Sequence, residues 1–159
     1  KTNQVEADMI AAMVERIFRQ ADRFDYSATV GVIVPYRNQI ATVRNAIDRY
    51  GIPALHSITI DTVERFQGSQ RDYIIYGLTV QQRYQLNFLT DNVFEEDGTL
   101  IDRKLNVAMT RARKHLTIVG NPDILAGSAV YRRLMDFMKS RGCYFNVACE
   151  KFCAGDFSV

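Results

Sequence analysis

Four short apolar segments, separated by stretches of helical periodicity, constrain the fold of this chain more than any other feature. They are residues 29–34, 57–61, 73–79 and 115–119. The first is β-branched and lacks polar alternation, which predicts a strand buried on both faces. Strands that alternate with helices predict an α/β fold, with a mostly parallel central sheet, right-handed crossovers and helices on both faces.

The expected helices follow from apolar residues at spacings of three and four. Asn3 and Glu6 resemble a capping box, and the apolar stripe after them predicts a first helix. A second helix is expected after the first strand and ends before Gly51, and a third is expected over residues 103–112. A last helix is expected before Gly142.

The chain has 159 residues, of which 47% are apolar, and this length fits a single domain. We expect that domain to span residues 1–159. Residues 81–102 are polar and are expected to form an exposed, irregular excursion, and the pattern assigns no structure to the tail at residues 143–159. We see no signal peptide and no apolar run near the roughly 20 residues that span a bilayer, so we expect a cytoplasmic protein without a membrane partner. The first residue is Lys1, as expected for a piece of a longer protein.

The three cysteines, Cys143, Cys149 and Cys153, have the spacing C-x5-C-x3-C and no neighbouring histidine. This pattern is atypical of a zinc site and of a disulfide framework. We therefore expect reduced, structural thiols and no metal site in this chain.

An abrupt change of charge marks the second half of the chain. Residues 91–102 carry five acids and no base, and residues 103–115 carry five bases and no acid. The net charge of +2 does not by itself indicate nucleic-acid binding, but the local reversal suggests a cationic site, with a solvated helix face as the alternative. Arg111 and Arg113 lie in this basic stretch. A guanidinium stays charged and matches phosphate oxygens, so the pair is suited to sense a nucleotide's terminal phosphate.

Ligands of parallel α/β sheets bind at the carboxyl ends of the strands. Three segments with polar side chains are expected there: residues 35–37, residues 62–70 and the approach to Arg111. The pattern therefore predicts that these polar groups converge on one edge of the sheet.

Three blocks, in order, carry a resemblance to a known family. Residues 32–39 resemble motif IV of superfamily 1 helicases, residues 60–72 resemble motif V, and residues 105–113, followed by 118–121, resemble motif VI. Over about residues 1–125, the chain resembles the C-terminal RecA-like motor domain of a superfamily 1 DNA/RNA helicase, in the branch of the nonsense-mediated-decay helicase and its bacterial relatives. This resemblance implies a three-layer RecA-like fold.

The resemblance also implies a nucleotide site. Arg111 would be the arginine finger that reaches the γ-phosphate of ATP, where a cation is worth about 10³ to 10⁵ in rate; a surface salt bridge is its alternative. Gly68 would let the backbone approach the nucleotide closely. Gln70 replaces the family's glutamate and would contact the ribose without adding charge. Arg113 would complete the site, or would brace the interface or an acidic partner, because residues two apart on a helix point apart.

Motifs IV and V imply contacts with single-stranded nucleic acid, which is the expected partner. Thr62 stands where the family has a hydroxyl residue that contacts a phosphate, through its hydroxyl or its amide, and capping of the following turn is an equal alternative. Tyr36 would pack on a sugar or stack near a base, with the core rim as its equal alternative. Arg37 would contact a phosphate, and Gln39 is expected to be structural.

The chain lacks two parts of a complete ATPase site. It contains no G-x-x-x-x-G-K-[ST] loop and no Asp-Glu pair at a strand end. In this family both belong to the N-terminal RecA-like domain, so the resemblance implies that domain of the same protein as a partner. It also implies ATP with Mg²⁺ as the cofactor, the metal being held by that domain. We predict that the isolated chain neither hydrolyses ATP nor unwinds a duplex.

Two alternatives to a motor domain remain. A non-catalytic nucleic-acid-binding or regulatory module derived from a helicase is favoured only by Gln70, and the intact motif VI argues against it. A Rossmann-type cofactor enzyme is disfavoured because no G-x-G-x-x-G follows a strand. The sequence is compatible with either DNA or RNA as the strand.

Overall fold

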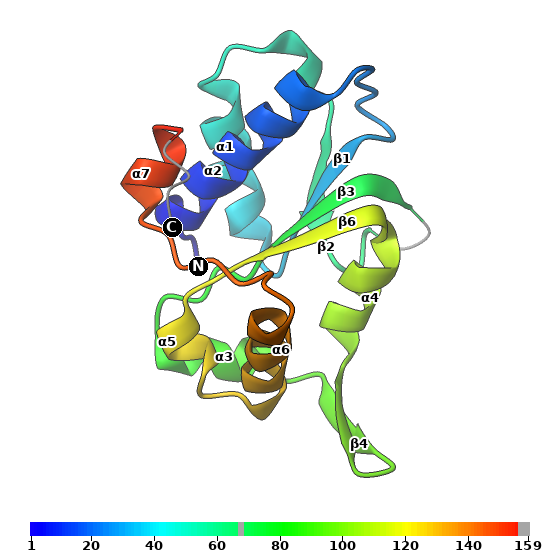
Figure 1. The fold of residues 1–159 in the computed structure, drawn as a ribbon, viewed down its shortest axis with the longest axis vertical. Helices are drawn as coiled ribbons and strands as arrows, with labels where there is room; N and C mark the ends of the chain where they lie inside the picture. The colour runs from blue at the N-terminus through cyan, green and yellow to red at the C-terminus, as the bar shows by residue number, and fades with distance from the viewer. Residues whose placement is uncertain (67–68, 156–159) are drawn as a thin grey trace.

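A four-stranded parallel sheet forms the centre of the molecule, in the order β2-β1-β3-β6 (Figure 1). The computed structural model describes residues 1–66 and 69–155. The strands are β1 (Val30–Val34), β2 (Thr59–Thr62), β3 (Arg71–Gly77) and β6 (Ala112–Val119). Each of the four apolar segments of the sequence overlaps one of these strands, so the predicted mostly parallel sheet is confirmed.

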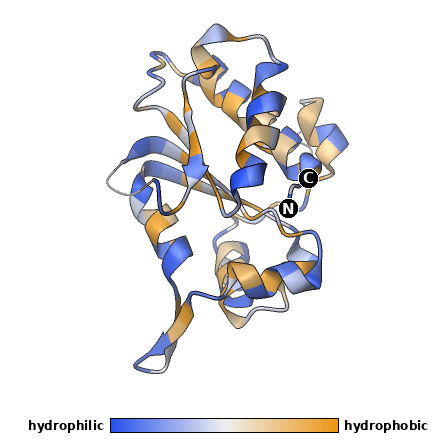
Figure 2. Cartoon of the chain, turned by 180° about the vertical axis from the view of Figure 1, so that it is seen from behind, coloured by the Kyte–Doolittle hydropathy of each residue, from blue (hydrophilic) through white to orange (hydrophobic). Residues whose placement is uncertain are grey.

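Two helices cover one face of the sheet. They are α1 (Gln4–Gln20) and α2 (Arg37–Asp48), and a short 3-10 turn, η1 (Pro53–Leu55), follows them. Val30, Val32 and Val34 of β1 share one buried cluster with residues of both helices. The short helix α7 (Cys149–Cys153) packs on the outside of α1. Along the ribbons of Figure 2, the helices carry both hydrophobic and hydrophilic segments, as amphipathic helices do.

The opposite face is covered by helices from the second half of the chain. These are α3 (Arg83–Leu89), α4 (Arg103–Arg111), α5 (Pro122–Leu125) and α6 (Ala129–Ser140). Ile33, Ile74 and Tyr76 point to this side and form a second buried cluster with them. Strand residues thus alternate between the two clusters, as a pleated strand buried on both faces requires. The predicted three-layer arrangement is confirmed.

Residues 81–102 are more ordered than the sequence analysis expects. They contain α3, whose Leu86 and Leu89 are buried, and an antiparallel hairpin of β4 (Val93–Glu96) and β5 (Thr99–Asp102). The hairpin turns at Asp97 and Gly98, both with positive φ, which is the geometry that an Asp-Gly pair favours. The prediction of an irregular excursion is therefore wrong, although the hairpin does project from the body of the molecule (Figure 1).

Some negative findings apply to residues 1–66 and 69–155. None of their helices has the length and apolar character needed to cross a bilayer. No three of their histidine, cysteine, aspartate or glutamate side chains gather as metal ligands would. The three cysteines are free, and the Sγ atoms of Cys149 and Cys153 lie 3.7 Å apart on α7.

Candidate nucleotide and nucleic-acid sites

The candidate residues fall on two opposite edges of the sheet. Val34 is paired with Thr62 at the ends of their strands, so Thr62, Tyr36 and Arg37 lie at the carboxyl edge. Gln70 and Arg111 directly precede β3 and β6, whose first residues pair with each other, so they lie at the amino edge. The prediction of one common edge is wrong, because a residue before a parallel strand lies at the end opposite to a residue after it.

At the amino edge, Gln70 lies beside the end of α4. Its Nε2 donates to the backbone carbonyl of Thr110 over 3.2 Å, which joins the residues after β2 to the helix that ends at Arg111. The Arg111 side chain is half-buried, and its Nε is buried without an acceptor among the residues described. Gly68, the third residue assigned to the nucleotide, lies outside the described residues, as does Gln67.

Arg113 is already held by other groups of this chain. It lies on β6 rather than on a helix, because the backbone changes from α4 to strand at Ala112. Its Nε donates to Oδ1 of Asp72 over 2.9 Å, and its guanidinium donates to the carbonyl of Ala28 over 2.9 Å. These are the contacts of a brace to an acidic partner, the second of its two interpretations.

Asp72 links two bases at this edge. Besides Arg113, it pairs with the Nζ of Lys114 at 3.4 Å. Partial burial raises the pKa of the Asp72 carboxyl, but the hydrogen bonds from Arg113 and Lys114 outweigh that effect, so the pKa lies below its ordinary value. Asp72 is therefore an ionised partner of these side chains rather than a free carboxylate.

At the carboxyl edge, Tyr36 and Thr62 are buried and Arg37 is exposed at the start of α2. The Tyr36 ring stacks on Phe88 of α3, with 5.0 Å between centroids, which is the position of a core-rim residue. The amide of Thr62 already donates to Oδ1 of Asp61 over 2.8 Å. A phosphate contact by Thr62 would therefore come from its hydroxyl, not from its amide.

Between the two edges, residues 63–66 follow Thr62 and residues 69–70 precede β3. Phe66 in this segment is buried against Gly31 of β1, where an added Cβ would lie 2.5 Å from the Phe66 Cζ. The guanidinium of Arg71 donates to Oγ1 of Thr59 over 2.9 Å and to Oγ of Ser69 over 2.6 Å, which anchors the end of the segment. Residues 63–70 thus connect Thr62 at one edge with Gln70 at the other.

The buried polar residues Gln39 and Asn3, near the carboxyl edge, bond to each other. Gln39, expected to be structural, is fully buried and bonds both the amide and the carbonyl of Asn3. Asn3 caps α1 by accepting from the Glu6 amide, but the Glu6 side chain does not complete the capping box. Instead, its Oε2 accepts from the amide of Thr79 over 2.6 Å.

Glu6 is a buried acid that the sequence analysis missed. Its Oε1 has no hydrogen-bond partner in the described part of the chain. Burial raises the pKa of the Glu6 carboxyl to about 8, against the opposing effect of the Thr79 amide. Thr79 itself has a φ of 66°, a conformation that a β-branched residue rarely adopts. Nothing local in the sequence indicates this pairing, because the two residues are 73 positions apart.

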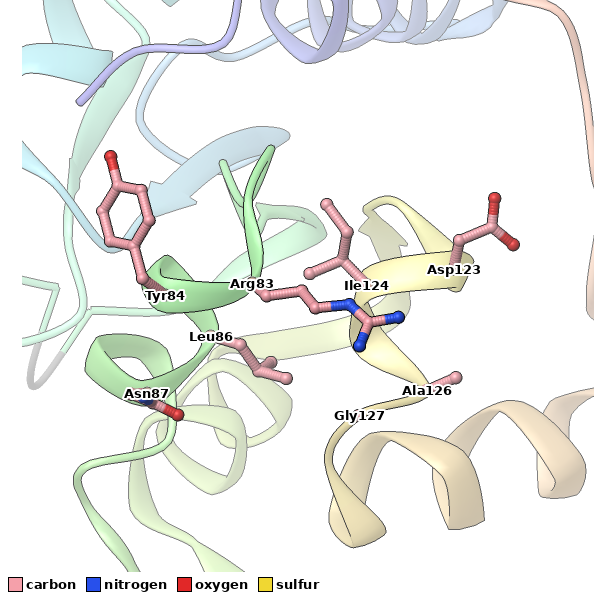
Figure 3. A pocket seen from close by; sticks show the side chains of 8 residues that line it. All are labelled: Arg83, Tyr84, Leu86, Asn87, Asp123, Ile124, Ala126 and Gly127. Carbon is pink, nitrogen blue, oxygen red and sulfur yellow. The ribbon is translucent and has the colours of Figure 1, made fainter.

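A pocket of about 520 Å³ lies between α3 and α5, on the carboxyl side of β3 and β6 (Figure 3). Its lining residues are Arg83, Tyr84, Leu86, Asn87, Asp123, Ile124, Ala126 and Gly127. Arg83 extends across it from α3 toward α5, and the ring of Tyr84 points away from α5. None of the residues predicted to bind nucleotide or nucleic acid lines this pocket.

The three-layer fold and the parallel sheet define a RecA-like α/β domain. A family model described as "AAA domain" matches residues 1–123. The chain is 32% identical over 141 residues to "Helicase sen1" of Schizosaccharomyces pombe, which covers 87% of this chain and 8% of that protein. It is 31% identical over 154 residues to "Helicase SEN1" of Saccharomyces cerevisiae, which covers 95% of this chain and 6% of that protein.

A third relative is the "Regulator of nonsense transcripts 1 homolog" of Drosophila melanogaster, 32% identical over 145 residues, or 87% of this chain and 11% of that protein. The chain belongs to the superfamily 1 helicases, of which it is a RecA-like domain. It spans between 6% and 11% of the length of these three relatives.

Proposed function

We propose that this domain is the second motor domain of an ATP-dependent helicase. In this proposal, the amino edge contributes the arginine finger Arg111 and part of the ATP pocket through Gln70 and Gly68. The carboxyl edge contributes part of the track for a single strand. The observation that carries the proposal is the half-buried Arg111, whose Nε has no acceptor among the described residues, beside Gln70.

The chemistry assigned to Arg111 is charge stabilisation. When the terminal phosphoryl group is transferred, negative charge spreads over its equatorial oxygens, and a fixed guanidinium lowers the energy of that state. Arg113 would act indirectly, because its guanidinium is engaged by Asp72 and Ala28. It would hold the start of β6, and so the end of α4, in position.

The amino edge fits the phosphates of ATP better than it fits their metal ion. Mg²⁺ prefers carboxylate oxygens and water. Asp72, the carboxylate that pairs with Arg113, also pairs with Lys114. Holding Mg²⁺ therefore falls to the N-terminal RecA-like domain, which we propose as the partner across the cleft.

Residues 63–70 offer a physical link between the two sites. Because this segment follows Thr62 and ends at Gln70, a shift at the nucleotide site would displace backbone that leads to the strand site. Alternation between two such states would move a strand past the domain.

The test is Arg111→Ala in the full-length protein. We expect ATP turnover to fall by about 10³-fold or more, while ATP binding is mostly retained, because the lost interaction acts mainly in the transition state. Arg103→Ala, at the other end of the same helix, is the matched control and should leave turnover near the wild-type rate. Unchanged turnover in Arg111→Ala would reject the motor function and favour a non-catalytic module.

A further inference from the structure

Two exposed aromatic side chains of α3 lie beside the carboxyl edge of the sheet. Tyr84 and Phe88 are one helical turn apart, so they share a side of the helix. Their exposed fractions are 61% and 42%. Two large rings side by side leave an apolar surface open to solvent, and such surfaces mark contact sites.

Phe88 is joined to the candidate strand track through Tyr36. The two rings are nearly parallel, with 24° between their planes. The Tyr36 hydroxyl also donates to the backbone carbonyl of Gln85 over 3.4 Å, which fixes α3 against the segment after β1. The aromatic surface is therefore continuous with the edge where Tyr36, Arg37 and Thr62 lie.

Two cations lie beside the Phe88 ring. The Nζ of Lys1 lies 4.6 Å from the Phe88 centroid, and the Nζ of Lys104 lies 4.9 Å from it. Lys104 comes from α4 and is also held by Asp91, at 3.4 Å. Exposed aromatic rings beside positive charges are the combination that binds single strands, because bases stack on the rings and cations bind the phosphates.

We infer that Tyr84 and Phe88 form a stacking platform for bases of a single strand, with Lys1 for its phosphates. The inference rests on the proposed function, because the platform extends the proposed track onto α3. Lys1 lies over both the Tyr36 and the Phe88 rings, on the side of Phe88 where Tyr36 stacks. A base takes the face of Phe88 that Tyr36 does not cover, and the flexible ammonium of Lys1 turns to the adjacent phosphate. Stacking is sequence-tolerant, which suits a motor that moves along any strand.

The pocket between α3 and α5 is a weaker candidate for the strand. Figure 3 shows Arg83 spanning this pocket and Tyr84 directed away from α5. Tyr84 also lines this pocket, but its ring is directed away from α5. The bases are therefore assigned to the exposed rings of Tyr84 and Phe88 rather than to the space between α3 and α5.

The platform is tested by strand binding to the full-length protein. Phe88→Ala and Tyr84→Ala should each weaken binding of a labelled single-stranded oligonucleotide by roughly tenfold, measured by fluorescence anisotropy. Phe88→Trp keeps a stacking surface and should retain the affinity. Phe137→Ala, which removes a 55% exposed ring of α6 outside the platform, is the matched control and should have no effect.

An abasic oligonucleotide of the same length separates stacking from charge. The wild-type protein should bind it more weakly than the base-bearing strand, and the loss in Phe88→Ala should be confined to the base-bearing strand. Unchanged affinity in both alanine variants would overturn the platform and leave the surface to a protein partner. Equal losses on both strands would also overturn it, because the rings would then not stack on bases.

The platform and the proposed function can fail separately. Unchanged ATP turnover in Arg111→Ala would reject the motor function even if the aromatic variants lose base-dependent binding. Normal base-dependent binding in the aromatic variants, with turnover lost in Arg111→Ala, would reject only the platform.

Discussion

At the scale of single residues, the two arginines of motif VI differ in their partners. Arg113 donates to Asp72 and to the Ala28 carbonyl, whereas the Nε of Arg111 has no acceptor in the described part of the chain. A buried donor without an acceptor costs about 1–3 kcal/mol, and more when the group is charged. The unsatisfied Nε of Arg111 means that its guanidinium is not committed to an acceptor in the described part of the chain and can bind a ligand. For this reason we assign the arginine finger to Arg111 rather than to Arg113.

Glu6 makes a pH dependence predictable at the same scale. Its carboxyl ionises near 4.5 when unfolded and near 8 when folded, so between these values the folded state binds an extra proton. The free energy of unfolding should therefore fall as pH rises from about 4.5 to about 8. Glu6→Gln should remove this slope and raise the free energy at pH 8.5 by about 1–3 kcal/mol relative to wild type, as measured by urea unfolding.

The control for that experiment is Asp22→Asn, which neutralises an exposed carboxylate just after α1. It should leave the slope as in the wild type. A wild-type stability that is flat or rising between pH 5 and pH 8, with Glu6→Gln parallel to it, would contradict the buried-acid account.

At the scale of elements, residues 63–70 are the feature that joins the two edges. The Phe66 ring is buried over Gly31, so this residue of the segment is packed onto the sheet. Packing at native density transmits displacements, because a buried ring cannot move without moving its neighbours. The link between the two candidate sites depends on this contact.

Gly31→Ala should disturb the contact by overpacking. The new Cβ would lie 2.5 Å from the Phe66 Cζ and 3.0 Å from the Arg71 Cγ, so the ring must shift. We expect a loss of about 1–3 kcal/mol in the free energy of unfolding, measured by chemical denaturation. Phe66→Leu in the same chain makes room and should recover part of that loss. Strictly additive effects of the two substitutions would show that the clash is not the cause.

The strands of the sheet could be predicted from the sequence, whereas the hairpin and the contacts between distant segments were not. The apolar runs predicted all four strands of the sheet because short apolar runs between helical patterns are typical of parallel strands. Only β1 is buried along its whole length, and β6, at the edge of the sheet, is mostly exposed or half-buried. The hairpin was missed although Asp97-Gly98 is a hairpin signal, because the polar residues around it masked the strands. The pairing of Glu6 with Thr79 and the stack of Tyr36 on Phe88 join distant segments, and local patterns carry no information on such contacts.

At the scale of the whole molecule, strand direction separates the two candidate sites. Their residues were predicted as edge residues, and they are, but on two edges rather than one, because a residue before a parallel strand and a residue after it lie at opposite ends. With Gln70 and Arg111 before their strands and Thr62 after its own, the sheet itself stands between the proposed nucleotide and the proposed single strand. Communication between them must therefore pass through the domain.

The same arrangement predicts that the isolated chain is inactive. Its amino edge supplies cations for the phosphates of ATP, but Asp72 there is engaged by Arg113 and Lys114, and the sequence has no phosphate-binding loop. Phosphate release by the purified chain, with ATP, Mg²⁺ and single strand, should equal the buffer background. The full-length protein should release phosphate from ATP. Arg111→Ala in the full-length protein should abolish this release, which would show that the activity depends on this domain. A rate above background for the chain alone would mean that it holds a complete site and that the division of the active site between two domains is wrong.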